Sequence, residues 1–96
     1  MRSVRRTEVF DRWLVDLRDR GAAGRIVVAV QKLAFDLGDI APVGAGVSEV
    51  RLNFGPGYRL YFVGRGERII ILLCGGDKAG QKRDIRMAKA MAKDLT

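Results

Sequence analysis

The feature that most restricts the fold is a run of six apolar residues at positions 69–74, Ile-Ile-Ile-Leu-Leu-Cys. Apolar side chains on both sides of an extended segment predict a strand that is buried on both faces. Such a strand needs neighbouring strands and a covering layer on each face. The chain has 96 residues, which suits one domain spanning residues 1–96 built around this strand.

Two segments before this run alternate between apolar and polar residues, at positions 49–53 and 58–63. This period of two predicts strands with one face toward a core. The glycine-containing segments 55–57 and 64–66 are short enough to be turns, so the three strands form an antiparallel meander. Residues 40–46 contain one proline and two glycines, and we expect them to be irregular.

The first half of the chain has the period of a helix instead. Thr7 is a suitable N-cap, and a first apolar helix face follows it: Phe10, Trp13, Leu14 and Leu17. Gly21 is predicted to end that helix or the short turn after it. A second face precedes Gly38 and Asp39, which should end the second helix: Ile26, Val27, Val30, Leu33, Ala34 and Leu37.

A weak strand at 3–6 and a last helix at about 81–94 complete the pattern. The predicted order is β-α-α-β-β-β-α. The fold class is therefore α+β: a small, twisted, mainly antiparallel sheet with an N-terminal helical hairpin and a C-terminal helix.

Composition excludes several kinds of chemistry. Cys74 is the single cysteine and histidine is absent, so an intrachain disulfide is impossible and we expect no metal site and no cofactor. The net charge of +7 favours a polyanionic partner. No apolar run is long enough to cross a bilayer and no secretory signal follows the basic start, so we expect a cytoplasmic protein without a membrane partner.

Strand parity places charged side chains together. Arg59 and Tyr61 share one face of their strand, and Arg51 shares the polar face of the preceding strand with Glu49. The expected register sets Arg51 beside Arg59 and Glu49 beside Tyr61. Two adjacent guanidinium groups repel each other unless an anion lies between them, and a phosphate is a suitable anion.

The last helix carries a cationic stripe spaced by four, three and four residues: Lys82, Arg86, Lys89 and Lys93. It is either a solvated face or a track for a phosphate backbone. An apolar stripe beside it should dock on the body: Ile85, Ala88, Ala92 and Leu95. Lys78 precedes this helix, after Gly75 and Gly76, which form either a nest for an anion or, as we favour, a tight turn.

Taken together, these motifs resemble the RelE/ParE toxin superfamily, and most of all its HigB-like branch of addiction module killer proteins. The resemblance covers about residues 3–95. It is carried by FDRWL at 10–14, VGAGV at 43–47, GPGYRLYF at 55–62, and LLCGGDK at 72–78 with Gln81, Asp84 and Ile85.

The resemblance implies a toxin of a type II toxin–antitoxin system. RelE-type members enter the ribosomal A site and cut messenger RNA by attack of the 2′-OH on the adjacent phosphate, without a metal. Such toxins are silenced by an antitoxin encoded next to them, here expected to be a helix-turn-helix protein. Two alternatives stay open: a ParE-like poison of DNA gyrase, and an inactive relative that only binds antitoxin.

The resemblance also suggests roles for residues. Arg59 matches the family arginine that contacts the scissile phosphate, Arg51 falls near a basic position on the preceding strand, and Lys78 falls where many members have a basic residue. We therefore expect Arg59, Lys78, Tyr61 and Arg51 to be catalytic, with the stripe of the last helix binding RNA. The family's C-terminal catalytic tyrosine has no match here, since Asp84 stands near its position, so the general base is left open.

Overall fold

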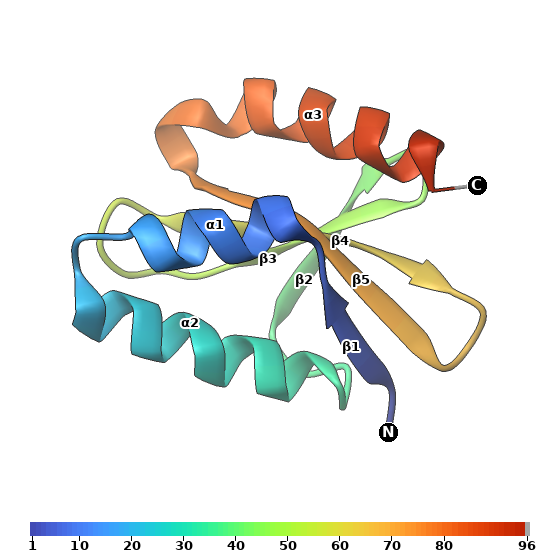
Figure 1. Ribbon diagram of the computed structural model, residues 1–96, viewed down its shortest axis with the longest axis horizontal. Helices are drawn as coiled ribbons and strands as arrows, with labels where there is room; N and C mark the ends of the chain where they lie inside the picture. Colours follow the sequence, from blue (N-terminus) through green and yellow to red (C-terminus); the bar gives the residue numbers. More distant parts are fainter. Residues whose placement is uncertain (96) are drawn as a thin grey trace.

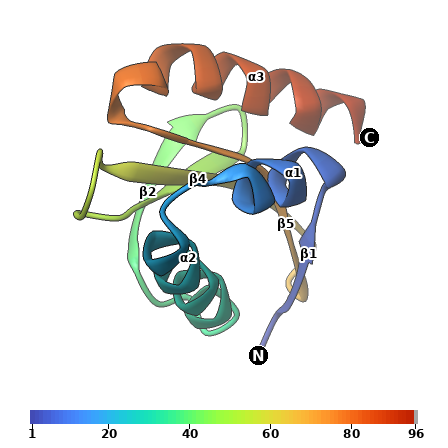
Figure 2. The ribbon, with the colours of Figure 1, turned by 60° about the vertical axis from the view of Figure 1, so that its left-hand side comes forward.

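The computed structural model describes residues 1–95 and shows one mixed, five-stranded sheet between two layers of helix. The strand order is β1-β5-β4-β3-β2. Helices α1 and α2 cover one face and α3 lies on the other (Figures 1 and 2). The strands are β1 (Ser3–Arg6), β2 (Asp39–Gly44), β3 (Val47–Arg51), β4 (Tyr58–Arg65) and β5 (Ile69–Asp77). The helices are α1 (Glu8–Asp16), α2 (Arg20–Leu33), the 3₁₀ turn η1 (Lys78–Gly80) and α3 (Gln81–Asp94).

The predicted α+β class is confirmed, but the predicted order lacked one strand. Residues 39–44, expected to be irregular, form β2 and pair antiparallel with β3. Pro42 is tolerated because β2 is an edge strand, where one side of the ladder needs no donor, and the register shifts at a bulge just after it. The glycines noticed in the sequence serve the turn into β3, where Gly44 and Gly46 have φ of 102° and 79°.

The apolar run at 69–74 is confirmed as a largely buried strand, with β1 pairing parallel on one edge and β4 antiparallel on the other. This strand, β5, continues to Asp77, so the expected tight turn at Gly75 and Gly76 is wrong. Neither glycine has a positive φ. Each instead permits a close approach: a Cβ on Gly75 would overlap the ring of Trp13, and one on Gly76 would overlap the carboxylate of Asp84.

Helices α1 and α2 end earlier than the sequence indicates. Thr7 caps α1 as predicted, accepting a hydrogen bond from the N–H of Phe10 at 3.1 Å. Gly21 does not end α1, because the Asp19 side chain accepts from the N–H of Ala22 and starts α2 before it. Helix α2 ends at Leu33 rather than at 37, since Asp36 turns the chain with a φ of 58°. Helix α3 has the predicted bounds.

Each face of the sheet has its own core. On one face, α1 and α2 pack on residues such as Leu60 and Leu72. On the other, Ala88 and Ala92 of α3 pack on a smaller cluster that contains Val47, Val63 and Leu73. Three residues assigned to apolar faces from the sequence are solvent-exposed instead of buried: Val27, Leu37 and Leu95. The sheet face beneath α3 is apolar near the end of that helix. The buried polar residues Glu49 and Asp84 lie near its start.

Candidate functional site

Arg51 and Arg59 are register partners in the β3–β4 ladder, as strand parity predicted. Glu49 pairs with Tyr61 in the same ladder. All four side chains belong to the face that α3 partly covers, because cross-strand partners point to the same side of a sheet. Arg51 and Arg59 are therefore neighbours at the end of the β3–β4 ladder.

Arg59 is almost buried, with 8% of its surface exposed. Its Nη1 donates to the carbonyl oxygens of Gly57 and Tyr58, at 3.2 and 3.1 Å. Its Nε is buried and has no hydrogen-bond partner in the described residues. The side chain is thus held from one side, while a strong donor is left unused.

Arg51 is more accessible and has two acidic neighbours. Its Nη2 lies 3.1 Å from Oδ1 of Asp39, and its Nε lies 3.8 Å from Oε2 of Glu49. At 3.8 Å the second contact is an ion pair without a hydrogen bond, and this Nε is also buried without a partner among residues 1–95. The repulsion expected between the arginines is therefore reduced by carboxylates in the resting protein.

Lys78 lies beside Arg59 at the turn that contains Gly57. A Cβ on Gly57 would lie 3.3 Å from Cβ of Lys78 and 3.6 Å from Nη1 of Arg59, so both side chains border this glycine. Gly57 has a φ of 78°, which favours glycine. The structure thus brings Arg59 and the exposed Lys78 together. Arg51 is the register partner of Arg59, and its side chain pairs with Asp39 of β2.

Tyr61 is the fourth, and it is placed differently from the expectation. It is fully buried, with 0% of its surface exposed, so it cannot stack on a base in this arrangement. Burial raises the pKa of its hydroxyl, and the nearby charges of Glu49 and Asp84 raise that pKa further. The hydroxyl has no hydrogen-bond partner in the described part of the chain. Tyr61 is a neutral packing residue beneath the site.

Two residues that the sequence did not single out complete the site. Glu49 is buried, and its Oε1 accepts a hydrogen bond of 2.9 Å from Nε2 of Gln81 at the start of α3. Strand parity had placed Glu49 on this face, but nothing local indicated that α3 would start above it. Gln81 ties the first turn of α3 to β3, and it fixes the carboxylate that faces Arg51.

Asp84 is the third buried charged residue, one turn further along α3. Its carboxylate packs against Gly76, the register partner of Arg59. Burial raises the pKa of this carboxyl, Arg83 at 3.6 Å lowers it by a smaller amount, and Asp77 raises it. Among the described residues, Asp84 contributes its backbone oxygen as acceptor for the thiol of Cys74, at 3.8 Å.

We predict that Asp84→Asn raises the free energy of unfolding at neutral pH. The folded-state pKa lies above the unfolded value, so the native state holds the proton more tightly, and stability falls as pH rises through that window. The gain from Asn should therefore vanish below the unfolded pKa of about 3.9. Urea unfolding at pH 7 and pH 3 measures this, with exposed Glu67→Gln as a control that shows no such trend. A less stable Asp84→Asn at pH 7 would show that the ionised group stabilises the fold.

The cationic stripe of α3 divides into two parts. Lys82 and Arg86 are exposed and line a shallow hollow of about 510 Å³ that also contains Lys78. Lys89 is partly buried, with its Nζ close to Gly44, and it lines a second hollow with Lys93 at the other end of the helix. The first pair thus shares a hollow with Lys78, whereas the second pair lines a different one.

The described residues offer no other obvious chemistry. Within residues 1–95 no group of three potential metal ligands occurs. Cys74 is buried and unpaired, as predicted, and burial raises the pKa of its thiol to about 12, which keeps it protonated. No helix in this part of the chain is long and apolar enough to cross a membrane.

The fold and site together define a small α+β protein with a cationic surface at one end of a twisted sheet. No family model matches the sequence. A protein of Haemophilus influenzae, described as uncharacterized, is 40% identical over 93 residues, which are 96% of this chain and 94% of that protein. This chain belongs to the same family as that protein.

Proposed function

We propose that the protein is the toxin of a type II toxin–antitoxin pair and that it cuts messenger RNA on the ribosome, as RelE-type toxins do. One observation carries this proposal: Arg51 and Arg59 are adjacent on one face, each with a buried Nε that has no hydrogen-bond partner in residues 1–95. A buried guanidinium donor without a partner is costly, and a phosphate that displaced the groups covering it would supply the missing acceptor. Lys78, Lys82 and Arg86 extend the same positive surface along the path of a polyanion.

The proposed reaction needs no cofactor. The ribose 2′-oxygen attacks the adjacent phosphorus, the bond from phosphorus to the 5′-oxygen breaks, and the products are a 2′,3′-cyclic phosphate and a 5′-hydroxyl. Arg59 stabilises the charge that develops on the phosphate, since a planar fork matches two of its oxygens. Arg51 binds the same phosphate from the neighbouring strand.

The two proton transfers fall to other groups. We propose that Lys78, which is exposed beside Arg59, donates the proton that the leaving 5′-oxygen needs. Glu49 lies 3.8 Å from Nε of Arg51, and we assign it the 2′-OH proton, with Gln81 fixing its orientation. This role requires that substrate binding exposes its carboxylate, which is buried in the free protein. Tyr61, which the sequence placed among the catalytic residues, supports this set from below.

In this proposal the partners are the ribosome, messenger RNA and an antitoxin encoded nearby. The test is an in vitro translation reaction to which the purified protein is added, followed by primer extension on the message. We expect cuts within the reading frame that require ribosomes and carry a 2′,3′-cyclic phosphate. Intact message together with gyrase-dependent DNA breaks would support the ParE-like alternative. Intact message and intact DNA would leave a binding protein without toxin activity.

A further inference from the structure

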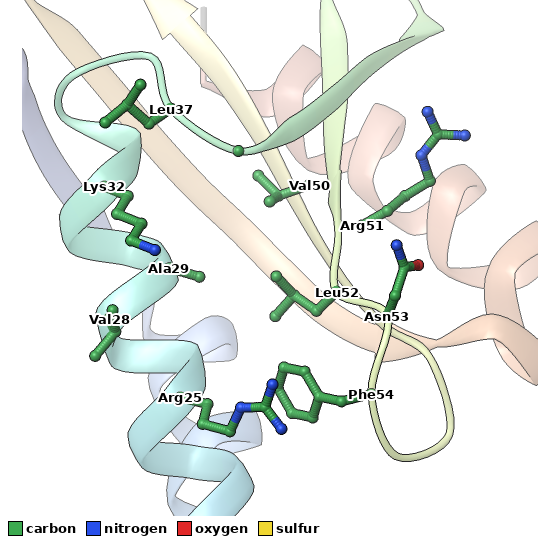
Figure 3. A pocket seen from close by; sticks show the side chains of 11 residues that line it. Arg25, Val28, Ala29, Lys32, Leu37, Val50, Arg51, Leu52, Asn53 and Phe54 are labelled. Atoms are coloured by element: carbon green, nitrogen blue, oxygen red, sulfur yellow. The ribbon is translucent and has the colours of Figure 1, made fainter.

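The sheet face opposite the candidate site contains a groove that the proposed function does not use. It lies between α2 and the segment 50–54, with a volume of about 340 Å³. Figure 3 shows Val50, Leu52 and Phe54 pointing from this segment toward α2, whereas Arg51 and Asn53 point to the other side. The groove is thus separated from the candidate site by the thickness of the sheet.

The walls of this groove are apolar and accessible. Val28 of α2 is 48% exposed and Leu37 is 55% exposed, and they face the partly buried side chains of Leu52 and Phe54. Exposed branched side chains around a concave surface of this size are suited to binding another molecule. The apolar lining indicates that the occupant contributes apolar side chains of its own.

The charges at the groove determine which occupant fits. Its lining includes the cations Arg25 and Lys32 of α2 and no acidic residue, and the side chain of the third lining cation, Arg51, points to the other face (Figure 3). In residues 1–95 neither Arg25 nor Lys32 forms an ion pair, and Arg25 lies over the ring of Phe54 at 3.7 Å. The nearest acidic side chains of neighbouring elements are already paired, Asp36 with Arg2 and Asp39 with Arg51. The groove therefore lacks the negative charges that would complement its cations.

The spacing on α2 sets the geometry. Arg25 and Lys32 are seven residues apart, which is about 10 Å along a helix, and Val28 and Ala29 lie between them on the same face. A partner helix with two acidic residues seven apart, and apolar residues three and four positions after the first, presents the complementary pattern. A second copy of this chain is disfavoured because the net charge is +7.

We propose that this groove, lined by Arg25, Val28, Ala29, Lys32, Leu52 and Phe54, binds an acidic amphipathic helix of a partner protein. Because the groove and the arginine pair lie on opposite faces, this partner leaves Arg51 and Arg59 uncovered. The proposal goes beyond the proposed function and does not depend on RNA cleavage. It assigns the protein a second surface, with an occupant of opposite charge.

The test uses a fluorescein-labelled, alanine-rich helical peptide of 16 residues with Glu at positions i and i+7 and Leu at i+3 and i+4. Fluorescence anisotropy measures its binding to the full-length protein. We expect saturable binding that Val28→Asp and Lys32→Glu each weaken about tenfold or more. A matched peptide with Lys in place of Glu should not bind. Equal binding of both peptides would overturn the proposal.

Two control variants separate this groove from general attraction to a basic protein. Lys82→Glu makes the same charge change on the opposite face, and Val15→Asp makes the same polar change on an exposed position of α1. Both should bind the peptide as the unaltered protein does, and circular dichroism should show all four variants folded. Equal weakening by Lys82→Glu and Lys32→Glu would overturn the proposal, as would a self-association, seen in sedimentation, that Val28→Asp abolishes.

The same variants keep this proposal distinct from the proposed function. Lys32→Glu should lose the peptide and still cut message in the translation reaction. A protein that binds the peptide but cuts no RNA would refute the nuclease and leave the groove intact. A protein that cuts RNA but does not bind the peptide would refute the groove and support the nuclease.

Discussion

Arg59→Ala is expected to reduce cleavage of messenger RNA about 10²- to 10³-fold, the usual loss when one donor to a transition-state oxyanion is removed. Arg59 is suited to this role because its Nη1 is already fixed by the carbonyls of Gly57 and Tyr58. Its orientation is therefore set before substrate binds, and its buried, unpartnered Nε would gain an acceptor if a phosphate displaced the groups that cover it. Primer extension in the translation reaction gives the rate, and growth arrest on expression gives the same comparison in cells.

The control must account for the structural contacts that Arg59 makes. Removing it takes the donor from the Gly57 carbonyl and one of two donors from the Tyr58 carbonyl, which also accepts from the N–H of Leu52, and this should cost about 1–2 kcal/mol of folding free energy. Arg65→Ala is the matched control, since Arg65 lies on the same strand and donates to the backbone oxygens of Gly64 and Ala92. It should lose a similar amount of stability and keep full cleavage. Undiminished cleavage by Arg59→Ala would refute the assignment of the phosphate site.

Arg59→Lys separates charge from shape at the same position. Lysine keeps the positive charge but offers no planar fork, so we expect activity between that of Arg59→Ala and that of the unaltered protein. If Arg59→Lys cleaves messenger RNA as fast as the unaltered protein, Arg59 acts by its charge alone. The three variants together distinguish oriented stabilisation of a phosphate from a general electrostatic contribution.

The part of this site that the sequence predicted is the part that depends on local periodicity. Strand parity is set by the pleat, so the pairing of Arg51 with Arg59 and of Glu49 with Tyr61 follows once the turn between the strands is recognised. The burial of Tyr61 does not follow, because it depends on where α3 crosses the sheet. The same crossing buries Asp84 and places Gln81 over Glu49. These contacts join positions far apart in the chain, and the local alternation of apolar and polar residues does not indicate them.

Proline and glycine misled the local interpretation in two places, for different physical reasons. At Pro42 the lost backbone donor suggested an irregular segment, but an edge strand has no partner there to lose. At Gly75 and Gly76 the absent side chains suggested a turn, but here they admit other side chains against an extended backbone. In both places the correct structure depends on what lies beside the strand, which is set by tertiary packing and not by the local sequence.

The close approach at Gly75 gives the largest expected effect on stability. A Cβ at this position would overlap the six-membered part of the Trp13 indole and lie 2.7 Å from its Cδ2. The ring cannot easily move aside, because Phe10 and Tyr58 pack against it with centroids at 5.7 and 6.1 Å. The backbone cannot easily move either, since Gly75 is paired with Leu60 in the β4–β5 ladder. Overpacking against such rigid neighbours destabilises a fold.

We therefore expect Gly75→Ala to lower the free energy of unfolding by about 3 kcal/mol, the upper end of the usual cost of overpacking. For a domain of this size that corresponds to a melting temperature roughly 10–20 °C lower, measured by circular dichroism. Gly24→Ala is the matched control: no atom lies within 4 Å of a Cβ there, so alanine should stabilise α2 by about 0.5–1 kcal/mol. If the overlap with the indole is the cause, Trp13→Leu should cost less in the Gly75→Ala background than alone, because leucine relieves the clash. Fully additive losses, or a Gly75→Ala protein as stable as the unaltered one, would mean that the ring yields without cost.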